Sequence, residues 1–216
     1  MLREDLSKVH AEIETNGYVI LNSIEESEIL GIAYGLGQPI PDSRTRQLVR
    51  PLIPVSAELA PGNTLSSRYG TGAFPFHTET AYQSNPIRYL MLYCVRPGFT
   101  QQPTLLSDLW YTCTTETQRC LTQDIWLVYR NANPFLTRIA EKSLDAVRIR
   151  FDPECMRPAH RSNSTSQIMQ QITPNRELIW QQRNLLIVDN HRMLHARGDS
   201  PMPDEDRLLL RVLVKE

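Results

Sequence analysis

The apolar positions of the first part of the chain recur at helical spacing, whereas those of the remainder fall into short, separated runs. Leu6, Val9 and Ile13 mark one apolar face, and the pattern stops at Gly17, a residue type that commonly ends helices. We therefore predict a helix over residues 2–16, a short strand over 18–22, and a second helix that begins at Ser23 or Glu25 and stops near Gly37.

Beyond these helices, the apolar runs end at turn-forming residues, as β-strands do. The clearest run covers residues 87–95, is apolar on both faces and ends at Arg96-Pro97-Gly98. Further strands are predicted at residues 46–53, 125–130, 147–152, 177–180, 184–189 and 207–214. One later helix is predicted from Ser107 or Asp108 towards Leu121. Early helices followed by many short strands indicate a mainly β protein, either a sandwich or a barrel.

Length and charge indicate an ordinary globular protein. The 216 residues favour a single domain, in which helices and a loop at residues 1–72 pack on a core formed by residues 73–216. The hydrophobic share is 41%, the charged share 22% and the net charge −1. Because no basic excess is present to neutralise phosphates, we expect a small-molecule substrate and not nucleic acid. The sequence leaves a homo-oligomer open.

The cysteines and the apolar runs indicate where the protein works. The 4 cysteines form no Cys-x-x-Cys pair, so we expect free thiols in a reducing compartment. The N-terminal segment lacks the apolar core of a signal peptide, and no apolar run approaches the ~20 residues of a membrane span. We therefore expect a cytoplasmic protein without a membrane partner.

The first candidate for chemistry is the segment Phe76-His77-Thr78-Glu79. In an extended chain alternate side chains leave on the same face, so His77 and Glu79 point together while Thr78 points away. An imidazole and a carboxylate placed in this way provide half of a two-histidine, one-carboxylate iron(II) site. The pair is weak evidence by itself, because His-x-Glu occurs by chance in many proteins.

Two later histidines follow the buried strand 184–189. His191 and His195 are four residues apart, as in zinc-binding helices, but the glutamate of such sites is missing and the flanks are strand and turn. In a strand that returns from the turn, His195 lies on the face opposite Leu194. His191 lies in the turn itself, where we expect a solvated side chain. His195 is therefore the better candidate for a distant metal ligand.

The last strand carries two arginines on one face. Arg207 and Arg211 are four residues apart, and the residues between and after them are apolar, so both faces of this strand are expected to be buried. A buried arginine without an anionic partner costs several kcal/mol. The partner is either a protein carboxylate or the carboxylate of a ligand bound beside a metal.

Together, these segments resemble the iron(II)/2-oxoglutarate dioxygenases of the taurine dioxygenase and clavaminate synthase-like superfamily. The resemblance rests on Phe76-His77-Thr78-Glu79, Thr104, Leu194-His195-Ala196-Arg197 and the Arg207/Arg211 pair. It covers the chain from about Tyr69 to the C-terminus, and the order and spacing of the pieces make it specific. It implies a double-stranded β-helix, the cupin-like jelly roll, with flanking helices.

The resemblance also implies a role for each residue. Three residues would hold the iron: His77, Glu79 and His195. Three would bind the co-substrate 2-oxoglutarate, although Arg211 could touch the substrate instead: Thr104, Arg207 and Arg211. Three more are candidate substrate contacts by position alone: Arg68, Tyr82 and Arg197.

The implied activity is a dioxygenase reaction that uses Fe(II), 2-oxoglutarate and O2 and releases succinate and CO2. The expected substrate is an amino acid or a related small metabolite of specialised metabolism, which would be hydroxylated, desaturated or cyclised. Halogenating relatives replace the carboxylate ligand with a small residue, so Glu79 argues against halogenation. Two alternatives stay open: a non-catalytic β-sandwich module that binds a carboxylated ligand on Arg207 and Arg211, and a zinc-dependent hydrolase that uses His191 and His195.

Overall fold

The structure of the protein is a computed structural model that describes residues 3–62, 64–130, 132–144, 146–160, 165–200, 202, 204 and 206–216, with side chains from residue 6 onward. The predicted N-terminal order is confirmed as α1 (Arg3–Asn16), β1 (Tyr18–Leu21), the 3-10 turn η1 (Glu26–Glu28) and α2 (Ile29–Leu36). The helix α1 ends at Gly17, whose φ of 80° lies in the left-handed region that favours glycine.

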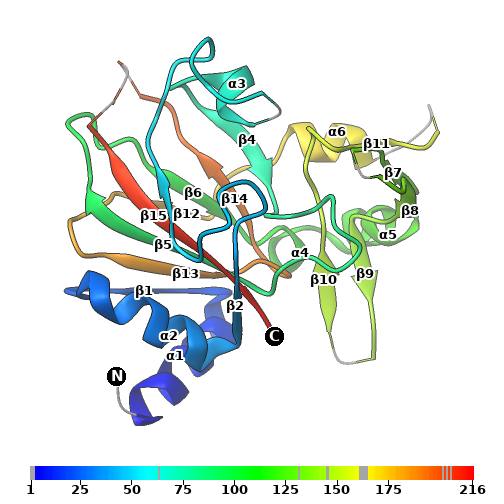
Figure 1. Cartoon of the computed structure of the whole chain (residues 1–216). Coiled ribbons are helices and arrows are strands. Elements are labelled where there is room, and N and C mark those ends of the chain that lie inside the picture. The colour runs from blue at the N-terminus through cyan, green and yellow to red at the C-terminus, as the bar shows by residue number, and fades with distance from the viewer. Residues whose placement is uncertain are drawn as a thin grey trace.

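The larger of the two main sheets is antiparallel and has six strands in the order β1–β13–β5–β15–β2, with β3 also paired to β15 (Figure 1). The strands not yet introduced are β13 (Leu185–Asp189), β5 (Tyr89–Arg96), β15 (Leu208–Lys215), β2 (Gln38–Ile40) and β3 (Arg50–Leu52). The N-terminal strands thus flank a centre built from the middle and the end of the chain.

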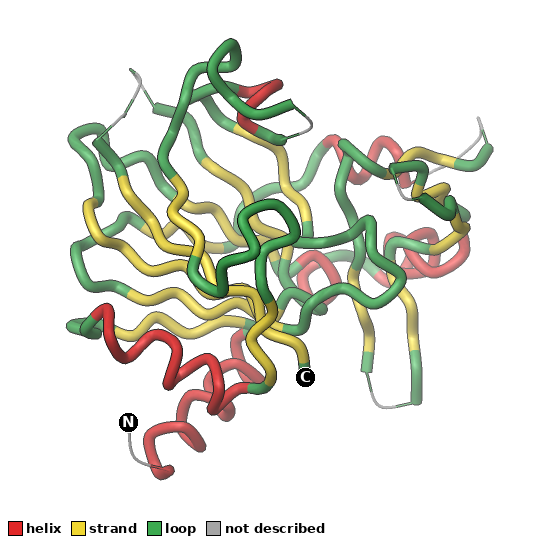
Figure 2. Tube along the Cα trace, viewed as in Figure 1, coloured by secondary structure: helices red, strands yellow, loops and turns green. Residues whose placement is uncertain are grey.

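The strand β5 shows why a run that is apolar on both faces is needed at the centre of this sheet. One face packs on the core beneath α1 and α2 through Tyr89, Met91 and Tyr93. The other face lies in the core between the two main sheets and carries Leu90, Leu92 and Cys94. Figure 2 shows the two helices lying along one side of the large sheet. The predicted strand at residues 87–95 is therefore confirmed.

The smaller main sheet has four antiparallel strands in the order β12–β6–β14–β4. Their bounds are β12 (Arg176–Leu178), β6 (Thr104–Ser107), β14 (Leu194–Arg197) and β4 (Phe74–His77). Its residues Leu106 and Leu178 share a core with Leu90 and Leu186 of the larger sheet, so the two sheets pack face to face. This arrangement gives the mainly β fold with flanking helices that the sequence predicts.

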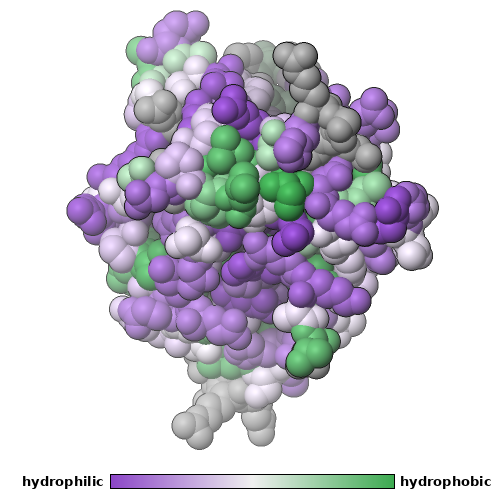
Figure 3. Space-filling view, turned by 90° about the vertical axis from the view of Figure 1, so that its right-hand side faces the viewer, coloured by the Kyte–Doolittle hydropathy of each residue, from purple (hydrophilic) through white to green (hydrophobic). Residues whose placement is uncertain are grey.

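A third group of elements lies beside the two main sheets. It contains a three-stranded sheet, β11–β7–β8, and a hairpin of β9 and β10. The strands are β7 (Trp126–Val128), β8 (Phe135–Thr137), β9 (Ala140–Lys142), β10 (Val147–Ile149) and β11 (Met156–Pro158), and the helix α6 (Thr165–Gln170) lies beside them. Seen from this side, the surface is largely hydrophilic with small apolar groups (Figure 3). No helix in the described ranges is long and apolar enough to cross a membrane.

Two local predictions were wrong. The single helix expected from Ser107 or Asp108 towards Leu121 is divided into α4 (Leu109–Thr112) and α5 (Thr115–Gln123). Thr114 is extended and its side chain accepts a hydrogen bond from the Thr117 N–H, so it begins a new helix and does not continue the old one.

The strand expected over residues 46–53 is shorter than predicted. Only β3, residues 50–52, pairs with β15. The preceding residues close a tight loop, in which Arg46 N–H donates to the Asp42 carbonyl at 2.9 Å. Farther along, the short helix α3 (Ser66–Tyr69) stands before β4, and the chain from β2 to α3 lines a cavity that opens between the main sheets.

Candidate metal centre

The pairing of β4 with β14 brings the predicted metal ligands together. The two strands are antiparallel neighbours, and His77 at the end of β4 is the register partner of His195 in β14. Their imidazole centroids are 4.2 Å apart. Glu79 lies just beyond β4, and one ligand atom from each of the three side chains lies within 4.8 Å of the others. The three residues therefore converge as the sequence predicted.

Both histidines offer a ring nitrogen to an ion. His77 Nδ1 lies 3.1 Å from the Pro75 carbonyl oxygen, which can only accept, so Nδ1 donates in this contact and Nε2 is the nitrogen left to face an ion. Burial, together with nearby His77 and Arg211, holds the pKa of His195 well below its ordinary value. Neither ring nitrogen of His195 hydrogen-bonds to a described residue, and its Nδ1 is buried. Two imidazoles and a carboxylate fit a divalent iron ion.

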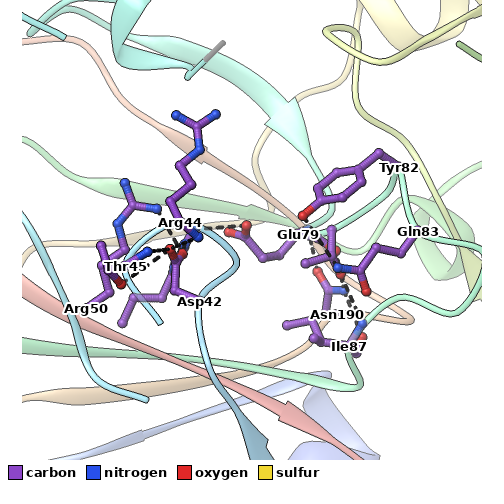
Figure 4. Close-up of polar contacts among 11 residues, drawn as sticks. Asp42, Arg44, Thr45, Arg50, Glu79, Tyr82, Gln83, Ile87 and Asn190 are labelled. Carbon is purple, nitrogen blue, oxygen red and sulfur yellow. Dashed lines mark hydrogen bonds and ion pairs between the residues drawn. The ribbon is translucent and has the colours of Figure 1, made fainter. Parts of the chain in front are cut away.

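The backbone at Glu79 is fixed by the side chain of Asn190, in the turn before β14. Asn190 Oδ1 accepts from the Glu79 N–H at 2.7 Å, and Asn190 Nδ2 donates to the Glu79 carbonyl at 3.0 Å. The same amide donates to the Ile87 carbonyl at 3.0 Å. Figure 4 shows Glu79 between Asn190 on one side and Asp42 with Arg50 on the other. Sequence reasoning identified only a turn here and missed this support.

Arg211 holds the side chain of Glu79. Its Nη1 lies 2.9 Å from Glu79 Oε1, and its Nη2 lies 2.5 Å from Asp42 Oδ2. Burial opposes the charge of Arg211, but the carboxylates of Glu79 and Asp42 raise its pKa above the ordinary value. Of the two partners that the sequence left open for a buried arginine, Arg211 has protein carboxylates.

Arg207 has the same chemistry and different surroundings. It is 5% exposed, and its Nη1 donates to the backbone carbonyl of Gln102 at 3.2 Å and to Gln102 Oε1 at 3.4 Å. It forms no ion pair with any described residue. Burial lowers the pKa of Arg207 to about 10, although Cys94 and Asp204 oppose that shift. Arg207 is thus a charged group that can still donate hydrogen bonds to a ligand.

Thr104 and Arg207 face the same space as the metal ligands. The side chains of His77, Glu79, His195, Thr104 and Arg207 all line one cavity of about 750 Å³. The Thr104 hydroxyl accepts a hydrogen bond from Trp180 Nε1 at 3.0 Å, which leaves its own hydrogen available to a ligand. A carboxylate in this cavity would meet a threonine hydroxyl and a guanidinium that no described carboxylate pairs with.

Solved structures that resemble this fold include non-heme iron oxygenases. OrfP in complex with Fe and α-ketoglutaric acid has a TM-score of 0.78 and 17% sequence identity, covering 100% of this chain and 81% of that one. Asparagine oxygenase with Fe(II), 3-hydroxyasparagine and succinate has a TM-score of 0.77 and 18% identity, covering 99% and 78%. OrfP with Fe, succinate and (3S)-hydroxy-L-arginine matches at 0.77 and 18%, covering 99% and 82%. No protein-family model matches the sequence, and neither does any curated protein.

The protein has the fold of the non-heme iron oxygenases. The predicted double-stranded β-helix is thereby confirmed, and the ordering of the strands explains how it builds a site. In this fold the two histidines come from β4 and β14 of the smaller sheet and Glu79 follows β4, whereas the arginines come from β15 and the residue before it in the larger sheet. The cavity lies between them.

The candidate substrate contacts occupy three different environments. Tyr82 lines the cavity. Arg197 lies in the cavity wall, but it donates to the carbonyls of Gly72 and Gly70 at 2.7 and 2.5 Å and holds that loop. Arg68 Nε forms an ion pair with Glu154 Oε2 at 2.7 Å, and its side chain is 54% exposed. Of the three, Tyr82 is the best placed to meet a substrate.

Sequence reasoning missed two carboxylates in the cavity wall. Glu154 is paired with Arg68, and Arg130 lies 3.6 Å away, so its charge is balanced. Asp152 forms no ion pair with any arginine or lysine that the structure describes. Burial raises the pKa of Asp152, and His77 is the nearby group that most opposes this shift. The signal available in the sequence was an acidic residue at the end of the predicted strand 147–152.

The expected environment of His191 was wrong. Its ring is partly buried, its Nδ1 lies 3.3 Å from Arg88 Nη1, and burial together with Arg88 lowers the pKa of His191 to about 4. The strand β13 ends in a turn that places His191 against Arg88, away from the cavity. The group of possible ligands within the described residues contains His77, Glu79 and His195 without His191, which removes the basis for the zinc-hydrolase alternative.

Proposed function

We propose that this protein is an iron(II)/2-oxoglutarate-dependent oxygenase that hydroxylates an amino acid or a related small molecule and releases succinate and CO2. One observation carries the proposal. The His77, Glu79 and His195 group opens onto the same cavity as Arg207, a buried arginine that has no carboxylate partner among the described residues. The likeness to the OrfP and asparagine oxygenase folds supports it.

Each residue of the site has a role in this reaction. His77, Glu79 and His195 would hold Fe(II) on one face, which leaves the remaining positions for exchangeable ligands. When bound there, iron together with 2-oxoglutarate and O2 supplies the oxidising chemistry. Arg207 would form charge-assisted hydrogen bonds to a 2-oxoglutarate carboxylate, and Thr104 would donate one more.

Asp152 supports an amino acid as the substrate class. Asp152 is a half-buried carboxylate in the cavity wall that pairs with no arginine or lysine among the described residues, and an ammonium or guanidinium group on the substrate would provide that cation. The similar solved structures hold hydroxylated amino acids, 3-hydroxyasparagine in one and (3S)-hydroxy-L-arginine in the other. Desaturation or ring closure would need the same residues, and product analysis separates these outcomes from hydroxylation.

The setting of the reaction is part of the proposal. We expect the chain to act as one domain on a small molecule in the cytoplasm, without a nucleic-acid or membrane partner. All four cysteines are free, as is usual in a reducing compartment.

The proposal is tested first without a substrate. Anaerobic addition of Fe(II) and 2-oxoglutarate should produce the weak visible charge-transfer band of the chelate, and His77→Ala should abolish it. The exposed His160 offers a matched control, because His160→Ala removes a histidine outside the site and should leave the band unchanged. An absent band, or a band that persists in His77→Ala, would contradict the proposal.

The substrate is then sought by turnover. Amino acids with and without a cationic side chain are screened for succinate formation above the uncoupled rate. We expect stimulation by at least one amino acid, and we expect Asp152→Asn to remove most of that stimulation while the charge-transfer band persists. Stimulation by anionic substrates only would contradict the role proposed for Asp152.

A further inference from the structure

A chain of charged side chains runs from Glu79 away from the metal centre. Glu79 Oε1 pairs with Arg211 Nη1 at 2.9 Å, and Arg211 Nη2 pairs with Asp42 Oδ2 at 2.5 Å. Arg50 Nη1 contacts the same Asp42 oxygen at 2.9 Å. Charges therefore alternate from Glu79 to Arg50, and Figure 4 shows Asp42 and Arg50 on the side of Glu79 that faces away from Asn190.

Asp42 is built into its loop firmly enough to orient an arginine. Its Oδ1 accepts the N–H groups of Arg44 at 2.9 Å and Thr45 at 3.0 Å, which leaves Oδ2 for the two guanidinium groups. The side chain is 5% exposed. Although burial opposes ionisation, hydrogen bonds from Thr45, Arg50 and Arg44 hold the pKa of Asp42 well below its usual range. The carboxylate stays charged and fixed.

The division of the Arg211 donors has a consequence for Glu79. An arginine that faces a lone carboxylate tends to form a two-point pair that occupies both carboxylate oxygens. Here Asp42 takes one of the two terminal nitrogens, so only Oε1 of Glu79 is engaged. The second oxygen of Glu79 stays available to face the histidines.

We propose that Asp42 is a positioning residue for the metal centre, which acts through Arg211 to keep one oxygen of Glu79 free for the ion. The inference rests on the proposed function, because it takes Glu79 as a metal ligand. In this proposal Arg211 pairs with the protein carboxylates Glu79 and Asp42 and does not contact the co-substrate. The residues between β2 and β3 thereby become part of the site's machinery, although Asp42 need not touch the metal.

The test measures metal binding without turnover. Mn²⁺ is titrated into the metal-free protein, and the free-ion EPR signal gives the dissociation constant. Asp42→Asn keeps an oxygen for the Arg44 and Thr45 N–H groups but removes the charge, and it should weaken Mn²⁺ binding about 10-fold or more, as losses of outer-sphere support do. If Asp42→Asn does not fold, Asp42→Ser retains an oxygen for the turn and is measured in its place.

Two further variants separate positioning from a general structural role. Arg50→Gln removes the other ion pair of Asp42 but keeps an amide that can donate to Asp42 Oδ2, so Mn²⁺ affinity should stay within about 2-fold while Arg211 still holds Glu79. In an Arg211→Gln background the effect of Asp42→Asn should vanish, because the intermediary is gone. Unchanged Mn²⁺ affinity in Asp42→Asn overturns the proposal, and so does an equal loss in both backgrounds.

The outcomes also separate this inference from the proposed function. If Mn²⁺ binding to the natural sequence is insensitive to His77→Ala, the ion is not held at the site and both proposals fall. If binding depends on His77 while Asp42→Asn and Asp42→Ser bind as tightly as the natural sequence, the role of Asp42 alone is overturned.

Discussion

Arg207 and Arg211 have the same side chain and lie four residues apart, yet their surroundings differ completely. Arg211 engages two carboxylates, Glu79 and Asp42, and its charge is balanced within the protein. Arg207 engages a backbone carbonyl and an amide oxygen of Gln102, which balance no charge. The difference teaches that burial of a cation does not by itself mark a ligand site. The proposed ligand contact of Arg207 therefore rests on its place in the cavity beside the candidate metal ligands.

Charge balance therefore leads us to expect a structural role for Arg211 and a ligand-binding role for Arg207. An arginine whose partners are protein carboxylates contributes to the folded state in the absence of any ligand. An arginine without such partners destabilises the folded protein until an anion binds beside it. The anion then removes that cost, so the arginine strengthens ligand binding and does not stabilise the ligand-free fold. Substitutions at the two positions should accordingly change different measurements.

The largest expected effect comes from Arg211→Leu. This change leaves the mostly buried carboxylates of Glu79 and Asp42 side by side without the shared cation. We expect the metal-free protein to lose about 3–5 kcal/mol of unfolding free energy, measured by urea titration. A loss below about 1 kcal/mol, the value of an exposed pair, would show that the network does not hold the fold.

Arg207→Leu should weaken co-substrate binding and leave the stability of the protein intact. No described carboxylate loses its partner, so the unfolding free energy of the metal-free protein should stay the same or rise. Binding of 2-oxoglutarate to the anaerobic Fe(II) protein should weaken by about 2–5 kcal/mol, measured by titration of the charge-transfer band. An unfolded metal-free Arg207→Leu protein would mean that the arginine serves the structure and would remove the contrast with Arg211.

The comparison also shows how far the sequence reaches. Alternation along a strand placed both arginines in the core, and the apolar run at residues 87–95 identified the central strand of the larger sheet. The convergence of His77 with His195 followed once β4 and β14 were paired. Periodicity reports which face a side chain occupies. It does not report which loop meets that face.

The missed features share that cause. Asp42 lies in a loop whose sequence gives no sign that it will reach β15, and the amide of Asn190 meets Glu79 only because two distant turns come together. The predicted helix before Leu121 was interrupted because a threonine hydroxyl at Thr114 competes for backbone N–H groups, a local choice that apolar spacing does not record.

Asn190→Ala sharpens the comparison by separating the backbone of Glu79 from its side chain. The change removes hydrogen bonds to the Glu79 N–H and carbonyl in a buried place, which should cost about 1–3 kcal/mol of stability. We also expect weaker Mn²⁺ binding. Asn184→Ala is a matched control, since Asn184 is 4% exposed and bonds Asn22 and Gln181, away from the metal ligands. Equal Mn²⁺ affinity in both variants would limit Asn190 to folding.

Gln102→Leu should have the smallest effect on the binding of 2-oxoglutarate and concerns Arg207, which has no ion-pair partner among the described residues. The variant loses the Oε1 contact at 3.4 Å, while the backbone carbonyl at 3.2 Å still receives Arg207 Nη1. One weak hydrogen bond that orients a cation is worth about 0.5–1.5 kcal/mol, so the KM for 2-oxoglutarate should rise a few-fold with kcat unchanged. Because Gln102 Nε2 also bonds the Thr71 and Gly198 carbonyls, thermal unfolding must be measured alongside. A fall in kcat at constant KM would mean that Gln102 acts on the reaction by another route, and Arg207 would then be oriented by the backbone alone.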